Sequence, residues 1–440
     1  MTHEPAPRAR LLDFRGAVAL VVANTIGTGV FTTSGFALAD LGAPSYVMAA
    51  WLVGGLYALC GVAIYADLAA RYPQSGGEYA FLRQTLHPAL GTAAGWISLV
   101  AGFTSPIAAA ALGAELYAAR VGGFTPGAPW FASTLIIGLV VLHAGAPATG
   151  VRFQNIAVAI KVSAILAFIG FGAAPLMRAV AAAPSAPAEP FSWIAFGGSL
   201  VWISYAYSGW NAAVYVTGEV EGTGATVRRA LYAGAAAVIA LYLGVSAVIL
   251  YGAPLDELRG VADSGAVAAR ALGGATAEQA LSALIALALI TSASSMLLSG
   301  PRVYARMAQD GALPAILGRL HGDHPRIAIL AQGALCLVVV WSASLRNLLE
   351  FVGVTLSLSA AMVVIGWLRQ EFAAAHRPRP LLVAAGALFL TEATAISFTA
   401  LKMRPGSAIA ALLLIAVGLA SHYARGLRAG ATSTSDATSE

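Results

Sequence analysis

Two polar, glycine-containing stretches interrupt apolar segments of this 440-residue chain. The first runs from Asn24 to Phe31 (NTIGTGVF), and the second runs from Ser204 to Asn211 (SYAYSGWN). Glycine weakens a helix by roughly 1 kcal/mol relative to alanine, and a backbone group freed within lipid costs several kcal/mol unless it finds a partner. A helix break at either stretch is therefore tolerated only where protein or a water-filled cavity covers it.

Free main-chain groups at these two breaks are suited to a small zwitterion. Amide groups near Thr28 and Gly29 would hold a carboxylate, aided by the partial positive charge at a helix start. Freed carbonyl groups on both stretches would accept hydrogen bonds from an ammonium. The alternative is that glycine and serine serve close helix packing, but two breaks at matched positions favour binding. The predicted substrate-binding residues are Thr25, Ile26, Gly27, Thr28, Gly29, Tyr205, Ala206, Ser208 and Gly209.

A third chemical feature is Lys161, which lies in an apolar segment nine residues after Arg152. At 1.5 Å per residue it lies roughly 13 Å into a hydrocarbon core about 30 Å thick, where an ammonium costs at least about 2.5 kcal/mol. We expect it to be partnered and to occupy the place of a sodium ion. The alternative is a lysine that reaches up to the interface. For a buried Lys161, the candidate partners are a freed carbonyl of the first break and the hydroxyls of Ser292, Ser294 and Ser295.

Composition excludes a soluble domain, because 59% of the residues are hydrophobic and only 10% are charged, against about 25% charged in soluble proteins. The net charge of +5 comes without a basic patch outside the loops, so we expect no nucleic-acid partner. Cys60 and Cys336 lie in apolar runs and are expected to be core residues. No phosphate-binding loop, zinc motif or nucleophile–base pattern stands out, so we expect neither an enzyme nor a bound metal or cofactor.

A membrane span needs about 20 apolar residues, and the chain has twelve candidate segments. Lysine and arginine are concentrated in the loops on the N-terminal side, which predicts that both termini are cytoplasmic. We expect a multi-pass protein of a bacterial inner membrane. Residues 1–15 lack the features of a removable signal peptide. The candidate spans are residues 16–39, 44–69, 90–118, 130–146, 155–175, 191–218, 230–251, 277–307, 327–344, 348–368, 381–401 and 408–424.

The second break lies five spans after the first, so the two broken spans cross in opposite directions. This arrangement predicts an all-α fold with an inverted-topology repeat of five spans, residues 16–175 against 191–368. Residues 381–424 form two further spans, residues 1–15 a cytoplasmic segment, and residues 425–440 a disordered cytoplasmic tail. Glu392 lies outside the repeat, so we expect a packing or oligomer contact. Residues 254–272 are expected to form either an extracellular lid or a plain interfacial helix.

Four stretches resemble signatures of the amino acid–polyamine–organocation (APC) superfamily. Residues 27–31 resemble its Gly-Ser-Gly-Ile-Phe motif of span one. Residues 205–219 resemble span six of the L-type amino acid transporters and their bacterial alanine–serine–cysteine exchanger relatives. Residues 73–79 and 306–314 resemble two cytoplasmic loop signatures. The resemblance implies a LeuT-like fold of twelve helices, with broken helices 1 and 6 and a substrate bound between them.

The resemblance also assigns roles to single residues. Lys161 matches the lysine of sodium-independent members, and Tyr242 matches a tyrosine thought to help coordinate that region. Tyr205 matches the aromatic gate, and Trp210 is expected to join it. Ser208 and Gly218 depart from the family pattern, where Gly and Glu are frequent. Residues 121–129 hold no cysteine, so no disulfide-linked heavy subunit is expected.

These observations predict a sodium-independent transporter of neutral amino acids, acting as an exchanger or a proton-coupled permease by alternating access. A transport-inactive amino acid sensor of the same fold remains the alternative. A membrane enzyme is disfavoured because no convergent acid–base or metal set lies in the spans.

Overall fold

The computed structural model describes residues 12–74, 76–145, 150–181, 190–222, 224–321, 324–375 and 377–436. This part of the chain is helical, and it has isolated bridges but no β-strand. The elements are α1 (Phe14–Thr25), α2 (Gly29–Leu41), α3 (Pro44–Arg71), α4 (Gly77–Thr85), α5 (Pro88–Ile97), the π-helical η1 (Ser98–Thr104), α6 (Ser105–Gly122), α7 (Trp130–Gly145), α8 (Gly150–Ala181), α9 (Trp193–Tyr207), the 3₁₀-helical η2 (Ala212–Glu219), α10 (Gly224–Gly252), α11 (Leu255–Leu258), α12 (Ser264–Gln309), the 3₁₀-helical η3 (Ala315–Gly318), α13 (Arg326–Ser342), α14 (Leu345–Ala373), α15 (Pro380–Met403) and α16 (Pro405–Asp436).

Seven helices of the described part are long and apolar enough to cross a bilayer, and the bent pair α1–α2 makes an eighth. Shorter apolar helices occupy Trp130–Gly145, Ala159–Ala174 and Arg326–Ser342. Helix therefore covers all or most of every expected span. The count of twelve crossings and the inverted repeat remain proposals.

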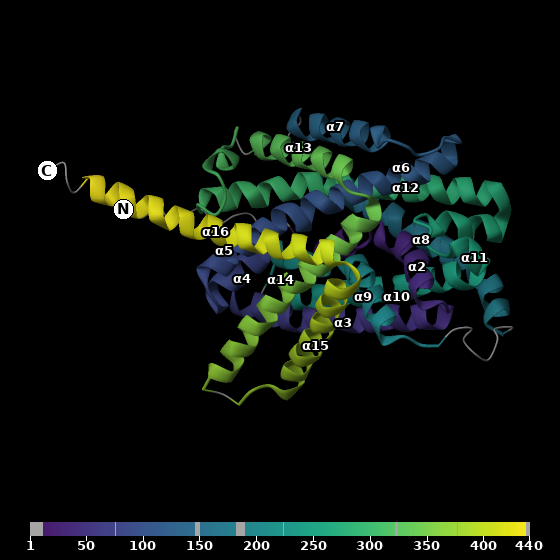
Figure 1. Cartoon of the computed structure of the whole chain (residues 1–440), viewed down its shortest axis with the longest axis horizontal. Coiled ribbons are helices and arrows are strands. Elements are labelled where there is room, and N and C mark those ends of the chain that lie inside the picture. The colour runs from purple at the N-terminus through teal and green to yellow at the C-terminus, as the bar shows by residue number, and fades with distance from the viewer. Residues whose placement is uncertain are drawn as a thin grey trace.

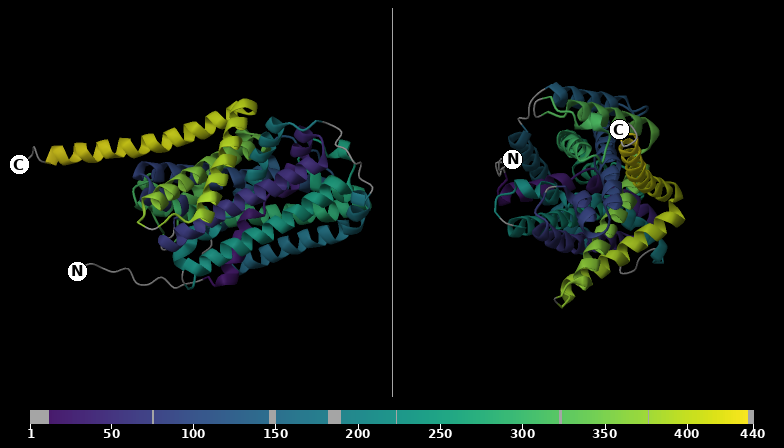
Figure 2. Two further views of the ribbon diagram at one scale, coloured as in Figure 1. Left: turned by 90° about the horizontal axis from the view of Figure 1, so that it is seen from below. Right: turned by 90° about the vertical axis from the view of Figure 1, so that its left-hand side faces the viewer.

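The helices form one elongated bundle (Figure 1). Helices α7 and α13 pack together along one edge, while α15 packs against α3 and α14 on another side. Helix α16 extends well beyond the other helices at one end of the bundle (Figure 2). The broken helices, together with α6 and α12, lie in the interior of this arrangement and carry most of the candidate site.

The C-terminal tail differs from the expectation of disorder from residue 425. Helix α16 continues to Asp436, because residues such as Ala429 and Ala431 favour helix and allow its hydrogen-bond ladder to propagate past the apolar part. Residues 437–440 lie outside the described part, as do residues 1–11 of the expected N-terminal segment.

Two ionic clusters mark the opposite ends of the bundle. Where α2 ends and α14 begins, Arg404 binds Asp40 at 3.0 Å and Glu350 at 2.8 Å. Where α3 and α14 end, Arg379 binds Asp67 at 2.6 Å and Glu371 at 2.7 Å. We call the first the Asp40 end and the second the Asp67 end.

Candidate functional site

The first break follows from how α1 ends. Thr25 is its last helical residue, and Ile26 has an extended backbone with φ −73° and ψ 101°. Helix α2 then starts at Gly29, and the two helices are bent by 41°. The break therefore falls at Ile26–Thr28, inside the stretch that its glycines indicated.

Side chains from two other helices satisfy the carbonyl groups freed at this break. The Tyr242 hydroxyl of α10 donates to the Thr25 carbonyl at 2.6 Å. The Ser292 hydroxyl of α12 lies 3.3 Å from the Ile26 carbonyl oxygen and shares its proton between this oxygen and the Ala288 carbonyl at 3.0 Å. Both hydroxyl-bearing residues are buried, so these bonds replace water that cannot reach the carbonyls and hold the unwound segment in place.

Lys161 lies behind the first break and is only 3% exposed. Its ammonium donates to the Ser292 hydroxyl, which in turn reaches the Ile26 carbonyl. The lysine is thus linked through one serine to the unwound main chain. Of the other two serines considered as partners, Ser294 bonds His143 at 2.8 Å and Ser295 lines the central cavity.

The second break begins directly after Tyr207, the last residue of α9. Ser208 is extended in ψ (146°), and Gly209 has φ +98°, a left-handed value that favours glycine. The chain resumes as the 3₁₀-helix η2 at Ala212. A polar four-residue segment, residues 208–211, therefore separates the two halves of this span.

The two breaks lie in direct contact. A Cβ atom at Gly29 would lie 2.5 Å from the Ala206 Cα, and one at Gly209 would lie 2.5 Å from the Asn24 carbonyl oxygen. The hydroxyls of Thr28 and Tyr205 are 2.8 Å apart and share a hydrogen bond. Segments about 180 residues apart in sequence are thereby fixed side by side, because only glycine allows so close an approach.

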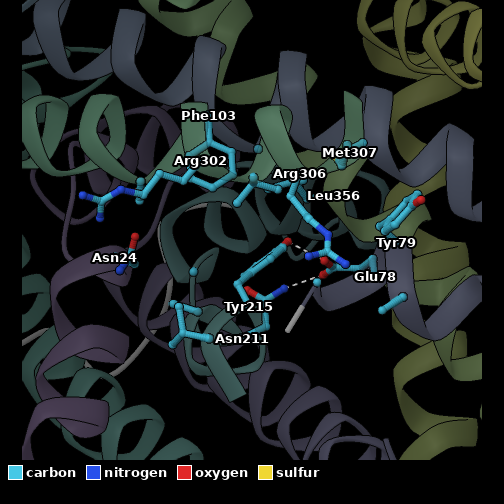
Figure 3. A pocket seen from close by; sticks show the side chains of 18 of the residues that line it. Asn24, Glu78, Tyr79, Phe103, Asn211, Tyr215, Arg302, Arg306, Met307 and Leu356 are labelled. Atoms are coloured by element: carbon cyan, nitrogen blue, oxygen red, sulfur yellow. Dashed lines mark hydrogen bonds between the residues drawn. The ribbon is translucent and has the colours of Figure 1, made fainter. Parts of the chain in front are cut away.

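A cavity of about 1320 Å³ opens beside the two breaks. It exceeds the roughly 300–1,000 Å³ of closed ligand pockets, and exposed residues such as Gln74 and Asp310 line it toward the Asp67 end. The cavity is therefore an open vestibule that leads from this end to the middle of the bundle. Figure 3 shows Asn24, Asn211 and Arg302 around it.

Relative to the cavity, these predicted site residues form three sets. Ser208, Gly209, Trp210 and Ser295 line it, together with the unpredicted Asn24, Ser204 and Asn211. Thr25, Ile26, Thr28, Gly29, Tyr205 and Ala206 are buried at the contact between the breaks, and Gly27 is half-buried there. Lys161 and Tyr242 are buried behind the first break.

A cluster of hydrogen bonds around one carboxylate, Glu78, lies at the cavity wall. This cluster was not identified as functional from the sequence. Glu78 of α4 accepts a hydrogen bond from Tyr65. It also accepts hydrogen bonds from Asn211 and Tyr215 (Figure 3). Asn211 belongs to the second break and Tyr215 to η2, so the cluster ties the 3₁₀ half of the broken span to the α3–α4 connection. Burial raises the pKa of the Glu78 carboxyl above its ordinary 4.5. The signal available in the sequence was a glutamate within a loop signature of a chain with few charges.

Three arginines, Arg83, Arg302 and Arg306, also line the cavity toward its opening. Arg83 donates to the Tyr79 hydroxyl at 2.6 Å, and Arg306 pairs with Asp310 at 3.3 Å. The side chains of Asn24, Ser204 and Ser208 beside the breaks are uncharged, whereas the carboxyl group of Glu78 also lines the cavity and bonds Asn211 of the second break. Within the described residues, no group of three or more His, Cys, Asp or Glu side chains could hold a metal ion.

The Asp40 end is closed over α2 by the segment expected to be a lid or an interfacial helix. The Gly260 amide donates to the Gly35 carbonyl at 2.9 Å, and the Ser264 hydroxyl donates to the Phe31 carbonyl at 2.7 Å. The main chain of Val261 packs directly on Gly35. Because Leu258 is fully buried, this segment covers protein and does not lie on a lipid surface there.

Comparisons with known proteins identify the family of this chain. The family described as amino acid permease matches residues 12–420. The chain is 26% identical over 399 residues to the serine/threonine exchanger SteT of Bacillus subtilis, covering 87% of this chain and 90% of that protein. It is 24% identical over 386 residues to the human large neutral amino acids transporter small subunit 2, covering 83% and 71%. It is 25% identical over 424 residues to the human cystine/glutamate transporter, covering 91% and 81%. The chain belongs to the amino acid permease family, within the APC superfamily of multi-pass membrane transport proteins.

Proposed function

We propose that this protein moves neutral amino acids across the membrane by alternating access and without sodium. The observation that carries the proposal is the contact of two unwound segments beside a cavity that opens at one end of the bundle. The amino acid would bind where this cavity meets the breaks, with main-chain groups holding its carboxylate and ammonium. The uncharged side chains of Asn24, Ser204 and Ser208 beside the breaks support a neutral side chain.

The open and closed ends support a defined state of the transport cycle. Many of the arginines that lie in loops are at the Asp67 end. This distribution favours a cytoplasmic position for the Asp67 end. Both termini would then be cytoplasmic, and the structure would be the inward-open state of a twelve-helix, five-plus-five repeat protein. The match to a bacterial exchanger supports a bacterial plasma membrane.

Sodium independence is supported by the position of Lys161. Its ammonium bonds Ser292, whose hydroxyl reaches the freed Ile26 carbonyl. A fixed positive charge at this position ties α8 and α12 to the first break, as a bound cation would. No heavy subunit is required for this chemistry, because α1, α8, α9, α10 and α12 of this chain supply all the contacts described.

Counterflow into proteoliposomes tests the proposal. The purified chain alone is reconstituted with unlabelled serine, threonine, alanine or leucine inside, and labelled amino acid is added outside in choline buffer. Uptake that depends on the internal amino acid and is unchanged by added sodium supports the proposal. Binding of amino acid without flux contradicts it and would favour a sensor.

A further inference from the structure

Glu392 occupies an unusual position at the middle of α15. It lies twelve residues after Pro380, about 18 Å along a helix long enough to cross the membrane. The residue is only 9% exposed, and its Oε1 atom has no hydrogen-bond partner in the described part of the chain. A carboxyl group at such a depth is costly when ionised, so its neutral, protonated form is strongly favoured.

The other buried glutamates of the described residues are all partnered. Glu371 and Glu350 bind Arg379 and Arg404, and Glu278 binds Arg120. Glu78 accepts from Tyr65, and Glu115 accepts the Ala132 amide at 3.1 Å. Within the part of the chain that the structure describes, Glu392 is the only one of these buried glutamates without a hydrogen bond or an ion pair. Its carboxyl group is therefore the one among these glutamates whose charge can change without breaking either a hydrogen bond or a salt bridge.

Among the residues that the structure describes, no cation compensates the charge of an ionised Glu392. On α3, the Tyr57 hydroxyl and the Cys60 thiol interact with it electrostatically. Helices α9, α14 and α16 also pack against α15, and within the described residues they bring no charged or titratable group into interaction with this carboxyl. Ionisation would thus leave an unpaired negative charge in the bundle.

Glu392 is connected to the central cavity through one aromatic pair. Phe389, about one helical turn before it, stacks on Tyr57 with ring centroids 4.1 Å apart. Both rings line the cavity, as does Ser357 beside the Tyr57 hydroxyl. The carboxyl group therefore lies behind the wall that these two rings form at the cavity.

The same wall contacts the second break. A Cβ atom at Gly61 would lie 2.6 Å from the Trp210 ring and 2.9 Å from the Phe389 ring. Trp210 follows Gly209 in the unwound segment. A movement of the broken span would displace Trp210 against this wall and change the access of water to Glu392.

We propose that Glu392 is a proton-binding site that couples amino acid transport to a proton gradient. A proton from one side binds the carboxylate oxygen and gives a neutral carboxyl group, and the same proton is released to the other side after the broken spans have moved. No other bond forms or breaks. This inference rests on the transport function proposed above and adds proton coupling to it.

The test uses proteoliposomes whose exterior is two pH units more acidic than the interior. The probe is labelled serine or leucine, whichever the wild-type protein exchanges in counterflow. One proton per amino acid would allow accumulation of up to about 100-fold at two pH units. We expect the wild type to accumulate amino acid under the gradient. Glu392→Gln, which keeps the shape without the titration, loses this accumulation but retains counterflow.

Two further measurements distinguish coupling from a structural role. Glu392→Asp keeps a carboxyl group and restores part of the gradient-driven uptake, whereas a structural role requires Gln to be the better replacement. A pH dye inside the vesicles records acidification on amino acid addition with the wild type and none with Glu392→Gln. Accumulation by Glu392→Gln equal to that of the wild type overturns the inference. Counterflow by the wild type that does not respond to a pH gradient also overturns it. Absence of counterflow in the wild type instead overturns the transport function itself.

Discussion

Gly209 packs directly on the main chain of Asn24, so the two unwound segments share one contact surface. A Cβ atom at Gly209 would lie 2.5 Å from the Asn24 carbonyl oxygen and 3.0 Å from the Thr25 nitrogen. The glycine also adopts φ +98°. Neither break can keep its position if this contact is lost, which makes the contact the geometric centre of the proposed substrate site.

Gly209→Ala is expected to reduce counterflow at least about tenfold, because the added methyl meets main-chain atoms and the left-handed backbone costs roughly 1–3 kcal/mol for a non-glycine residue. The matched control is Gly138→Ala on α7, where the described structure has no atom within 4 Å of the added Cβ. Transport by Gly209→Ala equal to that of Gly138→Ala would contradict the shared-contact geometry.

Lys161→Ala is expected to reduce counterflow by about 10- to 100-fold, because a buried hydrogen bond to a charged group contributes about 1.5–3 kcal/mol. Ser292→Ala, which removes the link between the ammonium and the Ile26 carbonyl, should give a smaller loss in the same direction. Initial rates in sodium-free vesicles measure both. Wild-type rates for Lys161→Ala would show that the lysine has no mechanistic role.

The buried carboxyl of Glu78 gives the protein a pH-dependent stability. Burial raises the pKa of Glu78 in the folded state above 4.5. The folded protein therefore binds the proton of this carboxyl group more tightly than the unfolded chain does. Below pH 4.5 the contribution is constant, and as pH rises through the folded pKa the ionised group destabilises the fold. Thermal unfolding in detergent should show a smaller fall of Tm with rising pH for Glu78→Gln than for the wild type. Equal slopes would contradict this sign.

The Asp40 end is expected to open more readily when Arg404 loses its charge. Arg404→Met leaves Asp40 and Glu350 without their shared guanidinium, and breaking a buried ion pair costs about 3–5 kcal/mol. The readout is alkylation of a cysteine at Ala37, which is fully buried on the helix that carries Asp40. The labelling rate should rise in a background without Cys60 and Cys336.

The control for Arg404 is Arg306→Met at the Asp67 end. Its pair with Asp310 is exposed, and such surface pairs contribute about 0–1 kcal/mol. Labelling at position 37 should therefore match the wild type. A rate for Arg404→Met no higher than for Arg306→Met would show that the cluster does not hold this end closed.

Local sequence signals predicted the positions of the breaks well. Gly27, Gly29 and Gly209 are costly in a helix, and the chain unwinds beside them. The family resemblance is also confirmed. The depth of Lys161 indicated a partnered lysine, and its bond to Ser292 was one of the possibilities considered.

Contacts between distant segments could not be predicted in the same way. Arg404 and Asp40 are separated by 364 positions, and Glu78 and Tyr215 by 137. No local periodicity specifies such pairs, because they depend on how whole helices pack. The cavity and its open end depend in addition on how the helices are arranged in this conformation. The helical continuation of α16 was missed because its polar composition suggested disorder, while local hydrogen bonding is sufficient to extend an existing helix.

The most direct test of the central claim is counterflow of a labelled neutral amino acid by the purified chain in sodium-free proteoliposomes, with Gly209→Ala measured in parallel. Sodium-independent alternating access predicts uptake by the wild type that requires an internal amino acid and is unchanged by sodium, and little uptake by the variant. Uptake that requires sodium, or binding without any flux, would contradict the account.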